Sequence, residues 1–284
     1  MVTVMRTGKI KKVSSRAIAY LCTIGMAVYC LFPVYWMLIT SLKSNKEIYS
    51  LVPTFWPKNI VFDGYIKLFG KLDFAQNILN SLFVSLVVSF VSVFVSMLAA
   101  YAIARVKFNG RTTISRGILY AYLMPQSLLF IPLYLLVSRL GLNNSLWGLI
   151  LIYPTITIPY ATWMLISYFK SIPVSLEEAA IMDGCSRWGA MFRICFPLSM
   201  PGIVSTLVFA FTLSWNEYLY ALVIINDSAI KTIPLALSDM VVADIYAWGP
   251  LMGGSIVSSI PIIVLYLLCN RHLISGMTAG GVKT

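Results

Sequence analysis

The sequence predicts an all-α membrane protein that crosses the bilayer several times. Hydrophobic residues make up 59% of its 284 residues and charged residues only 11%, a balance too apolar for an ordinary soluble domain. The apolar residues gather in long stretches, and a helix needs about 20 such residues to cross the hydrocarbon core. Lys and Arg are concentrated in alternate segments between those stretches, as expected when cytoplasmic loops carry the positive charge.

Six stretches are long and apolar enough to be transmembrane helices. They cover roughly residues 17–40, 80–104, 114–137, 146–169, 201–225 and 253–270. We expect them to form one transmembrane domain over residues 17–270, between a basic tail at 1–16 and a second tail at 271–284. The first stretch is too long for a cleaved signal and is not followed by a small-residue cleavage site.

Charge predicts how these six helices are oriented. With the N-terminus inside, the inner segments hold twice as many Lys and Arg residues as the outer segments, which is the positive-inside bias. Both termini then lie in the cytoplasm, the basic N-terminal tail lies near anionic headgroups, and a polar loop at 170–200 faces the same side. The bias also accounts for the net charge of +11 without any nucleic-acid partner.

The polar loop contains the signals of a short, exposed helix. Ser175 and Glu178 have the spacing of a capping box, so the helix is expected to start with Ser175 as its N-cap. Pro173 stops the preceding span from continuing. Farther on, Ala179 and Ala180 offer a small-residue face to a partner surface, and a glycine shortly after them allows a tight turn.

The same loop resembles the EAA loop in the membrane subunits of ABC importers. The family pattern reads EAA, three residues, G, nine residues, I, one residue, LP, and every spacing is matched, with Phe for the usual Leu as the one departure. The matching positions are Glu178, Ala179, Ala180, Gly184, Ile194, Phe196 and Pro197. In the family this loop forms a coupling helix that sits in a cleft of the ATP-hydrolysing subunit. The resemblance implies a set of ATPase-coupling residues, namely Glu177, Glu178, Ala179, Ala180, Asp183 and Gly184.

Five serines recur at steps of three or four residues along the second predicted span. They are Ser81, Ser85, Ser89, Ser92 and Ser96. That spacing places all five on one helical face, where small hydroxyl side chains let a neighbouring helix approach and form hydrogen bonds. The polar wall of a transport pathway is the alternative, and we favour helix packing.

The third and fourth predicted spans contain prolines. The prolines are Pro125, Pro132, Pro154 and Pro159. A proline frees a backbone carbonyl that must be satisfied by protein or by a water-filled cavity, and broken helices are common around transport pathways. A simple kink is an equally good interpretation for any one of them, although Gln126 beside Pro125 favours a cavity there.

Glu217 is the only acidic residue inside a predicted span. Counted from the start of the fifth span, it lies in the outer part of the membrane, where an ionisable side chain is a candidate for function. A carboxylate that reaches water from an aromatic belt is the equally good alternative. The surrounding sequence, Trp215 to Tyr218, resembles the WN[DE] segment of sugar-importer permeases. That resemblance favours a substrate pathway lined by Asn216, Glu217 and Tyr218.

The last outer segment, residues 226–252, combines acidic and aromatic side chains. They are Asp227, Asp239, Asp244, Tyr246 and Trp248. On an exposed loop such residues suit contact with sugar hydroxyls or with a partner protein, and an ordinary solvated loop is the plainer interpretation.

The sequence lacks the residues that covalent chemistry or nucleotide binding would need. It contains no G-x-x-x-x-G-K-[ST] loop, and its only histidine, His272, has no nearby set of Cys, Asp or Glu residues to hold a metal. No Ser, His and Asp grouping suits catalysis, because the outer face has no histidine. We therefore expect neither an enzyme nor a cofactor-binding chain, so that ATP and Mg²⁺ would sit on a separate ATPase subunit.

The chain as a whole resembles the second permease subunit of the maltose-type carbohydrate uptake family. The match extends over the end of the second span, the polar loop, the fifth span and the terminal segment at 274–284. The resemblance implies uptake of a sugar or oligosaccharide across a bacterial inner membrane. It also implies a complex with a second homologous permease, two ATP-binding subunits and an extracytoplasmic solute-binding protein. Two alternatives stay open: an importer permease for a non-sugar solute, and an ion-coupled secondary transporter, which would need charged relays inside the membrane.

Overall fold

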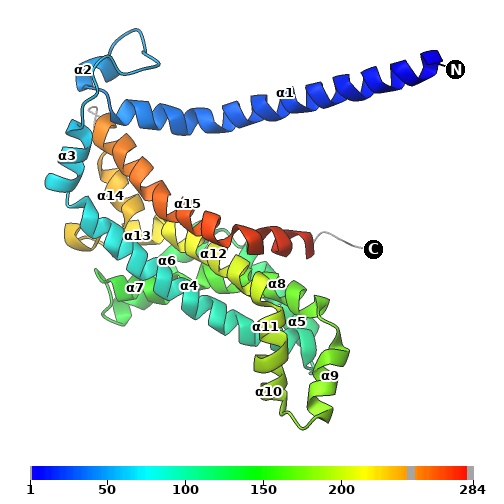
Figure 1. Cartoon of the computed structure of the whole chain (residues 1–284). Helices are drawn as coiled ribbons and strands as arrows, with labels where there is room; N and C mark the ends of the chain where they lie inside the picture. Colours follow the sequence, from blue (N-terminus) through cyan, green and yellow to red (C-terminus); the bar gives the residue numbers. More distant parts are fainter. Residues whose placement is uncertain (1, 242–246, 280–284) are drawn as a thin grey trace. The chain divides into compact units, whose positions relative to one another are not determined.

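The computed structural model describes residues 2–241 and 247–279, with the side chains of residues 18–241 and 247–271. Every regular element in these residues is helical (Figure 1). Four of the described helices are long and apolar enough to cross a membrane, and the number rises to six if each of two sharply bent pairs counts as one span. The predicted all-α, membrane-spanning fold is confirmed, and the orientation of the termini stays a prediction.

The chain divides into two compact units, and the first is formed by residues 1–72 and 240–257. Its helices are α1 (Val2–Ser41), α2 (Asn45–Ile48), α3 (Asp63–Gly70) and the first part of α15 (Trp248–Ala279). Because α1 begins at Val2, the predicted basic tail is helical and continuous with the first span. The backbones of α3 and α15 approach closely, since a Cβ atom on Gly64 would lie 2.8 Å from the carbonyl carbon of Gly249.

The second unit is formed by residues 73–239 and 258–284. Its elements are α4 (Phe74–Arg105), α5 (Arg111–Leu123), α6 (Gln126–Arg139), α7 (Leu146–Ile152), α8 (Pro154–Ser171), α9 (Val174–Met182), α10 (Arg187–Ala190), the π-helix η1 (Met191–Cys195), α11 (Phe196–Leu198), α12 (Met200–Trp215), α13 (Leu219–Ile224), the 3₁₀-helix η2 (Ser228–Ile230), α14 (Ile233–Asp239) and the rest of α15. Helices α4, α8 and α12 pack against one another at its centre, with α5 on α8 and α13 against α6 and α7 (Figure 1). Two buried apolar clusters lie along α4, one around Phe169 and the other around Tyr153.

The serine row of α4 packs against neighbouring helices, as predicted. All five serines are buried. Ser92 Oγ lies 2.6 Å from Thr157 Oγ1 of α8, and Ser96 Oγ donates to a backbone carbonyl of α8 at 3.2 Å. Nearer the start of α4, Ser81 Oγ accepts a 2.7 Å hydrogen bond from the backbone N–H of Ile233 in α14. The row therefore joins α4 to α8 and α14.

Two of the six predicted spans are broken. The third, expected over 114–137, is split before Pro125 into α5 and α6, which meet at 96°. Proline disfavours helical backbone at the residue before it and lacks an N–H, so α5 ends there. The fifth predicted span, expected over 201–225, is interrupted because α12 ends at Trp215. The segment that makes a 75° bend with α12 is the one before it, Arg187–Leu198. An uninterrupted fifth span was a wrong prediction.

Candidate functional site

Helix α9 carries the residues for which the sequence predicts a docking role. It begins at Val174 with Pro173 as its N-cap and has no side-chain cap, so the predicted capping box of Ser175 and Glu178 is wrong. The ring of Pro173 fixes φ at −57°, and this pre-set backbone starts the turn without help from a hydroxyl. Glu178 has no capping role and is exposed.

The C-terminal end of α9 is a Schellman motif centred on Gly184. The Gly184 N–H donates to the Ile181 carbonyl at 3.0 Å, and the Cys185 N–H donates to the Ala180 carbonyl at 3.0 Å. These two bonds define the motif, which places a left-handed residue just after the C-cap. Gly184 is that residue, with φ = +89°, and Asp183 is the C-cap. The predicted turn at Gly184 is confirmed.

Glu177 points into the protein and binds side chains from two other elements. Only 6% of the residue is exposed. Tyr101 Oη donates to Glu177 Oε1, while Cys195 Sγ and Arg105 Nε lie 3.4 Å and 3.3 Å from Oε2. Tyr101 and Arg105 belong to the last turns of α4, and Cys195 belongs to η1. We call these four residues the Glu177 cluster, and they tie α9 to α4 and η1.

Arg105 extends the Glu177 cluster to a fourth element. Its Nη2 donates a 2.7 Å hydrogen bond to the carbonyl of Ile172, the residue that follows α8. A buried charge is costly unless it is paired and hydrogen-bonded, and here a carboxylate and a carbonyl share one guanidinium. The sequence did not identify Tyr101 or Arg105 as part of the site. The available signal was their spacing of four residues, which puts a hydroxyl and a guanidinium on one helical face.

Apart from Glu177, the predicted coupling residues lie on the surface of α9 and the turn after it. The exposed or partly exposed ones are Glu178, Ala179, Ala180, Asp183 and Gly184. Ile181, Met182 and Trp188 add large exposed apolar side chains to the same segment, with 87% of Met182 exposed. Exposed apolar side chains with charged neighbours are typical of protein-interaction surfaces. We call these eight residues the α9 surface.

Aromatic rings connect the α9 surface to the end of α4. Trp188 stacks on Phe192 with ring centroids 6.3 Å apart, and Phe192 meets Phe196 edge-on at 4.9 Å. Phe196 stacks on Phe169 of α8 at 5.7 Å, and Phe169 meets Tyr101 at 6.0 Å. These are favourable separations for aromatic pairs. Phe196, the one departure from the family pattern, is therefore central to an unbroken row of rings.

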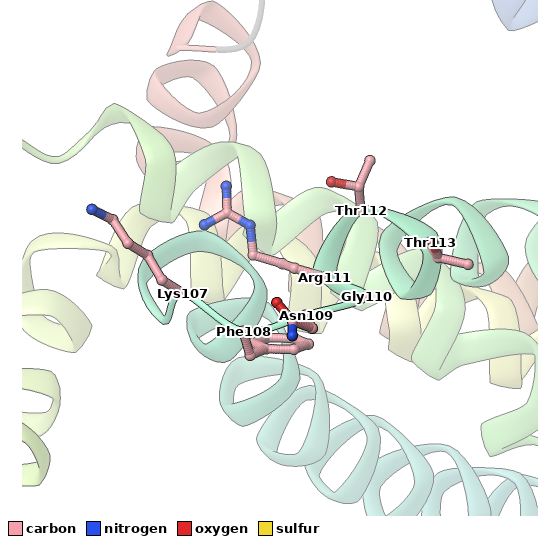
Figure 2. Close-up of a pocket in the computed structure, with 7 residues that line it drawn as sticks. All are labelled: Lys107, Phe108, Asn109, Gly110, Arg111, Thr112 and Thr113. Carbon is pink, nitrogen blue, oxygen red and sulfur yellow. The ribbon is translucent and has the colours of Figure 1, made fainter.

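The segment between α4 and α5 forms an open hollow of about 520 Å³. Its lining runs from Lys107 to Thr113, and Figure 2 shows the Lys107 side chain extending from the loop and the Arg111 side chain extending from the start of α5. Gly110, with φ = +86°, turns the chain into α5. All lining residues are exposed or partly exposed, so this is a solvated basic surface to which we assign no ligand.

Glu217 lies where α12 has ended and α13 has not begun. Helix α12 ends at Trp215 and α13 begins at Leu219, so the residues between them are not helical. Glu217 is 7% exposed, and its carboxylate accepts hydrogen bonds from the N–H groups of Tyr220 at 3.0 Å and Ala221 at 3.3 Å. It satisfies free N–H groups at the start of α13. The alternative interpretation, in which the Glu217 carboxylate reaches water, is therefore wrong. The hydrogen bonds to the start of α13 also explain the break in the fifth predicted span.

Asn216 and Tyr218 flank Glu217 and are exposed. Asn216 Nδ2 donates to the Thr212 carbonyl at 2.9 Å, which closes the last turn of α12, and 38% of Tyr218 is exposed. Two of the three predicted pathway residues are thus accessible, and Glu217 holds the backbone that presents them. Non-helical backbone at membrane depth is tolerated where it is buried in protein or lines a cavity.

Two acidic residues of the last predicted outer segment have partners within the chain. Asp239 Oδ2 pairs with Lys231 Nζ at 2.6 Å, and Asp227 accepts a 2.9 Å hydrogen bond from the Ala229 N–H. These contacts favour the solvated-loop interpretation for both. Within the described residues, no group of three or more His, Cys, Asp or Glu side chains could hold a metal ion. Outside the described residues lie Asp244, Tyr246 and residues 280–284.

Comparison with known proteins finds relatives over almost the whole chain. Residues 92–277 match the family model described as the binding-protein-dependent transport system inner membrane component. Over 276 residues the chain is 39% identical to the inner membrane ABC transporter permease protein YcjP of Escherichia coli, covering 96% of this chain and 98% of that protein. Over 282 residues it is 33% identical to the trehalose/maltose transport system permease protein MalG of Thermococcus litoralis, covering 96% and 99%.

The fold is also shared with a solved structure. That structure is described as a bacterial ABC transporter involved in the import of the acidic polysaccharide alginate. The match has a TM-score of 0.77 and covers 92% of this chain and 96% of that chain, at 21% sequence identity. It confirms the helical fold.

Proposed function

The chain belongs to the family of binding-protein-dependent transport system inner membrane components, and from that premise we propose that it moves a sugar or oligosaccharide inward. It is a multi-pass ABC permease of the inner membrane. The sugar class is supported by its 33% identity to a permease named for trehalose and maltose transport. The likeness of its Trp215 to Tyr218 segment to sugar-importer permeases supports the same class.

The assembly that we propose contains four kinds of subunit. A second homologous permease completes the channel, two ATP-binding subunits drive it, and an extracytoplasmic solute-binding protein delivers the sugar. ATP and Mg²⁺ bind to the ATP-binding subunits, and this chain supplies no catalytic residue. Its N- and C-termini and α9 face the cytoplasm, which agrees with the distribution of Lys and Arg in the sequence.

The opposite orientation of two adjacent glutamates on α9 carries the proposal. Glu178 is exposed on the α9 surface, whereas Glu177 is buried against Tyr101 and Arg105. An ATPase can therefore bind Glu178 and its exposed neighbours while Glu177 holds α9 to α4. We infer that closure of the ATPases moves α9 and that the Glu177 cluster passes this movement to α4 and α8. The exposed Asn216 and Tyr218 line the substrate pathway, positioned by Glu217.

The test compares Glu178→Gln with Glu177→Gln in the complete transporter. Both substitutions keep the size of the side chain and remove its charge. We expect Glu178→Gln to reduce co-purification of the ATPase, because its charge faces the partner. Glu177→Gln is expected to retain the ATPase and to lower uptake per ATP hydrolysed, because the internal link is weakened. If both variants keep full complex formation and ATP-driven uptake, α9 is not the coupling site.

Gly184 provides a second, steric test of the same surface. A Cβ atom at this position would meet nothing within 4 Å, so the chain itself leaves room for a side chain. Gly184→Ala and Gly184→Trp share the strain of a left-handed backbone, and only the second adds bulk. We expect the Trp variant to lose the ATPase to a much greater extent than the Ala variant. Equal retention by the two variants would argue against docking at this turn.

The substrate class is tested separately in proteoliposomes that contain the complete transporter. ATP-driven uptake that needs the solute-binding protein is measured for labelled monosaccharides and disaccharides, with an amino acid and a dipeptide as controls. Uptake of sugars alone is expected. Uptake of only the non-sugar solutes would overturn the sugar class and leave the coupling proposal standing.

A further inference from the structure

We propose that the first unit contains a binding site for one ring of a neutral sugar. The site is a cavity of about 200 Å³ between the end of α1, the segment that follows it and the start of α15. Its polar lining residues are Thr40, Lys43, Glu47 and Thr54, and its apolar walls include Trp36, Trp248 and Met252. We call it the α1–α15 cavity. The choice of a sugar rests on the proposed function, and the cavity itself does not.

Thr40 supplies a buried hydroxyl that lacks a partner. The residue is 7% exposed, and within the described residues its Oγ1 has no hydrogen-bond partner. Buried polar groups are nearly always hydrogen-bonded, because leaving one unpaired is destabilising. Thr40 lines the cavity, and we infer that a ligand held there supplies the missing partner.

Lys43 supplies a buried ammonium with donors to spare. The residue is 6% exposed, and its Nζ lies 4.9 Å from the centre of the Trp36 ring. The ammonium donates to the backbone carbonyl of Thr54, which in the described part of the chain is its one hydrogen bond. Because an ammonium has three N–H groups, two are left for oxygen atoms of a ligand.

Glu47 is a fixed, ionised acceptor at the same cavity. Its Oε1 accepts from Thr54 Oγ1 at 2.5 Å, and the Lys58 N–H lies 3.0 Å from Oε1 and 3.2 Å from Oε2. The hydrogen bond from Thr54 is the main cause that holds the pKa of Glu47 below its usual value. A carboxylate has about four acceptor positions, so Glu47 can still accept from a hydroxyl.

The charges of the cavity select a neutral polyol over an ion. Lys43 repels a cation and already occupies a face of Trp36, where a cation would otherwise bind. Glu47 repels an anion. Sugar hydroxyls both donate and accept, so they can meet the carboxylate, the ammonium and the Thr40 hydroxyl together, while the C–H faces of the ring contact Trp248 and Met252.

The size of the cavity limits the ligand to one ring. Pockets for drug-sized ligands hold roughly 300–1,000 Å³, and this cavity is smaller. In the predicted topology α1 ends on the extracytoplasmic face, where the solute-binding protein would release its sugar. The α1–α15 cavity would hold one ring of that sugar as it leaves the binding protein.

Saturation-transfer NMR on the complete purified transporter, without its solute-binding protein, tests this site. The probes are glucose, galactose, mannose, maltose and trehalose. Thr40→Val keeps the shape of the side chain and removes the hydroxyl, and Lys43→Met keeps its length and removes the charge. Lys46→Met, at an exposed lysine of α2, is the matched control. We expect at least one probe to bind the wild-type transporter. The same probe should bind the two cavity variants roughly tenfold more weakly, which corresponds to ~1.4 kcal/mol. It should bind Lys46→Met as well as it binds wild type.

Absence of a signal from every probe, or signals that neither cavity substitution changes, would overturn the proposal. Thr40→Val decides if the two variants disagree, because Lys43→Met also removes the contact with Trp36. Uptake by the same transporter in proteoliposomes, with the solute-binding protein added back, keeps this test apart from the proposed function. Normal sugar uptake with no effect of Thr40→Val on binding removes only the cavity site. Failure of wild type to take up any sugar removes the proposed function as well.

Discussion

Glu177 and Glu217 are both buried glutamates next to the start of a short helix, and their partners differ. Glu177 binds side chains from α4 and η1, which are distant in the sequence. Glu217 binds backbone N–H groups three and four residues ahead of itself. The Glu177 carboxylate joins separate elements through their side chains, whereas the hydrogen bonds that Glu217 accepts from backbone N–H groups lie within the start of α13.

On the proposed function, this difference leads us to propose that the two residues act in different steps of transport. A bond between α9 and α4 can transmit a movement, because both ends of it belong to helices that can be displaced. A bond within three or four residues cannot, but it fixes the backbone on which Asn216 and Tyr218 are presented. We therefore expect substitutions of Glu177 to change the coupling of ATP hydrolysis to uptake, and substitutions around Glu217 to change how the substrate is handled.

The largest effect is expected from Glu177→Ala. It leaves the Arg105 guanidinium buried without its carboxylate, and breaking a buried pair in this way costs about 3–5 kcal/mol. The loss is measured as a lower melting temperature of the purified transporter. Maleimide labelling of Cys195, with the other four cysteines replaced by Ser, reports opening of the Glu177 cluster itself. Melting and labelling like those of wild type would mean that the pair does not hold α9.

A double-mutant cycle separates pairing from general damage to the fold. Arg105→Gln combined with Glu177→Gln removes both charges at once and leaves neither unpaired. We expect the double variant to be more stable than the sum of the single losses predicts, because interacting residues are not additive. Simple additivity would contradict the ion pair.

Glu217→Ala is expected to have a smaller effect, of about 1 kcal/mol, which is typical for the loss of a helix N-cap acceptor. Glu217→Gln keeps an oxygen that can accept from the same N–H groups, so its stability and sugar uptake should stay close to wild type. The measurements are the melting temperature and the uptake rate of both variants. Equal loss of uptake by Gln and Ala would show that the charge, not the cap, is needed.

Asn216→Ala and Tyr218→Ala are expected to change stability least, within about 0.5 kcal/mol, because both side chains are exposed. If they line the substrate pathway, the Ala variants should raise the KM for sugar uptake, and Tyr218→Phe, which keeps the ring, should raise it less. Uptake kinetics at several sugar concentrations measure this. Unchanged kinetics in all three variants would remove these residues from the pathway.

The last prediction involves no intended change in stability and places the two regions on opposite sides of the membrane. Single cysteines at two exposed serines, Ser186→Cys after α9 and Ser228→Cys after α13, are labelled with a membrane-impermeant maleimide. The first should react only from the cytoplasm and the second only from outside. Labelling of both from one side would contradict the six-span topology and the separation of coupling from substrate handling.

Local backbone and periodic features could be predicted from the sequence. The serine row of α4 was predicted because its spacing defines one helical face, and that face is where α8 and α14 pack. The turn at Gly184 was predicted because a left-handed residue is a property of the backbone that glycine satisfies. In both cases the information lies within a few residues of the feature.

Features that depend on distant partners could not be predicted. Ser175 and Glu178 have the letters of a capping box, but Arg105 and Tyr101 hold Glu177 inside and no side chain caps α9. These partners lie more than 70 residues earlier in the chain, and no spacing rule links them. The break at Glu217 was missed because the apolar residues on both sides of it outweigh one polar triplet. A carboxylate placed before a new helical turn was the available signal.

The turn from Met191 to Cys195 is a π-helix, a form that contains one more residue than an α-helical turn needs. Deleting a single residue there would restore α-helical spacing and rotate α10 by about 100° relative to α12. Trp188 would then leave the row of rings that reaches Tyr101. During evolution, a change of one residue in the length of this turn would change the orientation of the α9 surface relative to α12. Exchanging one exposed side chain for another would leave that orientation unchanged.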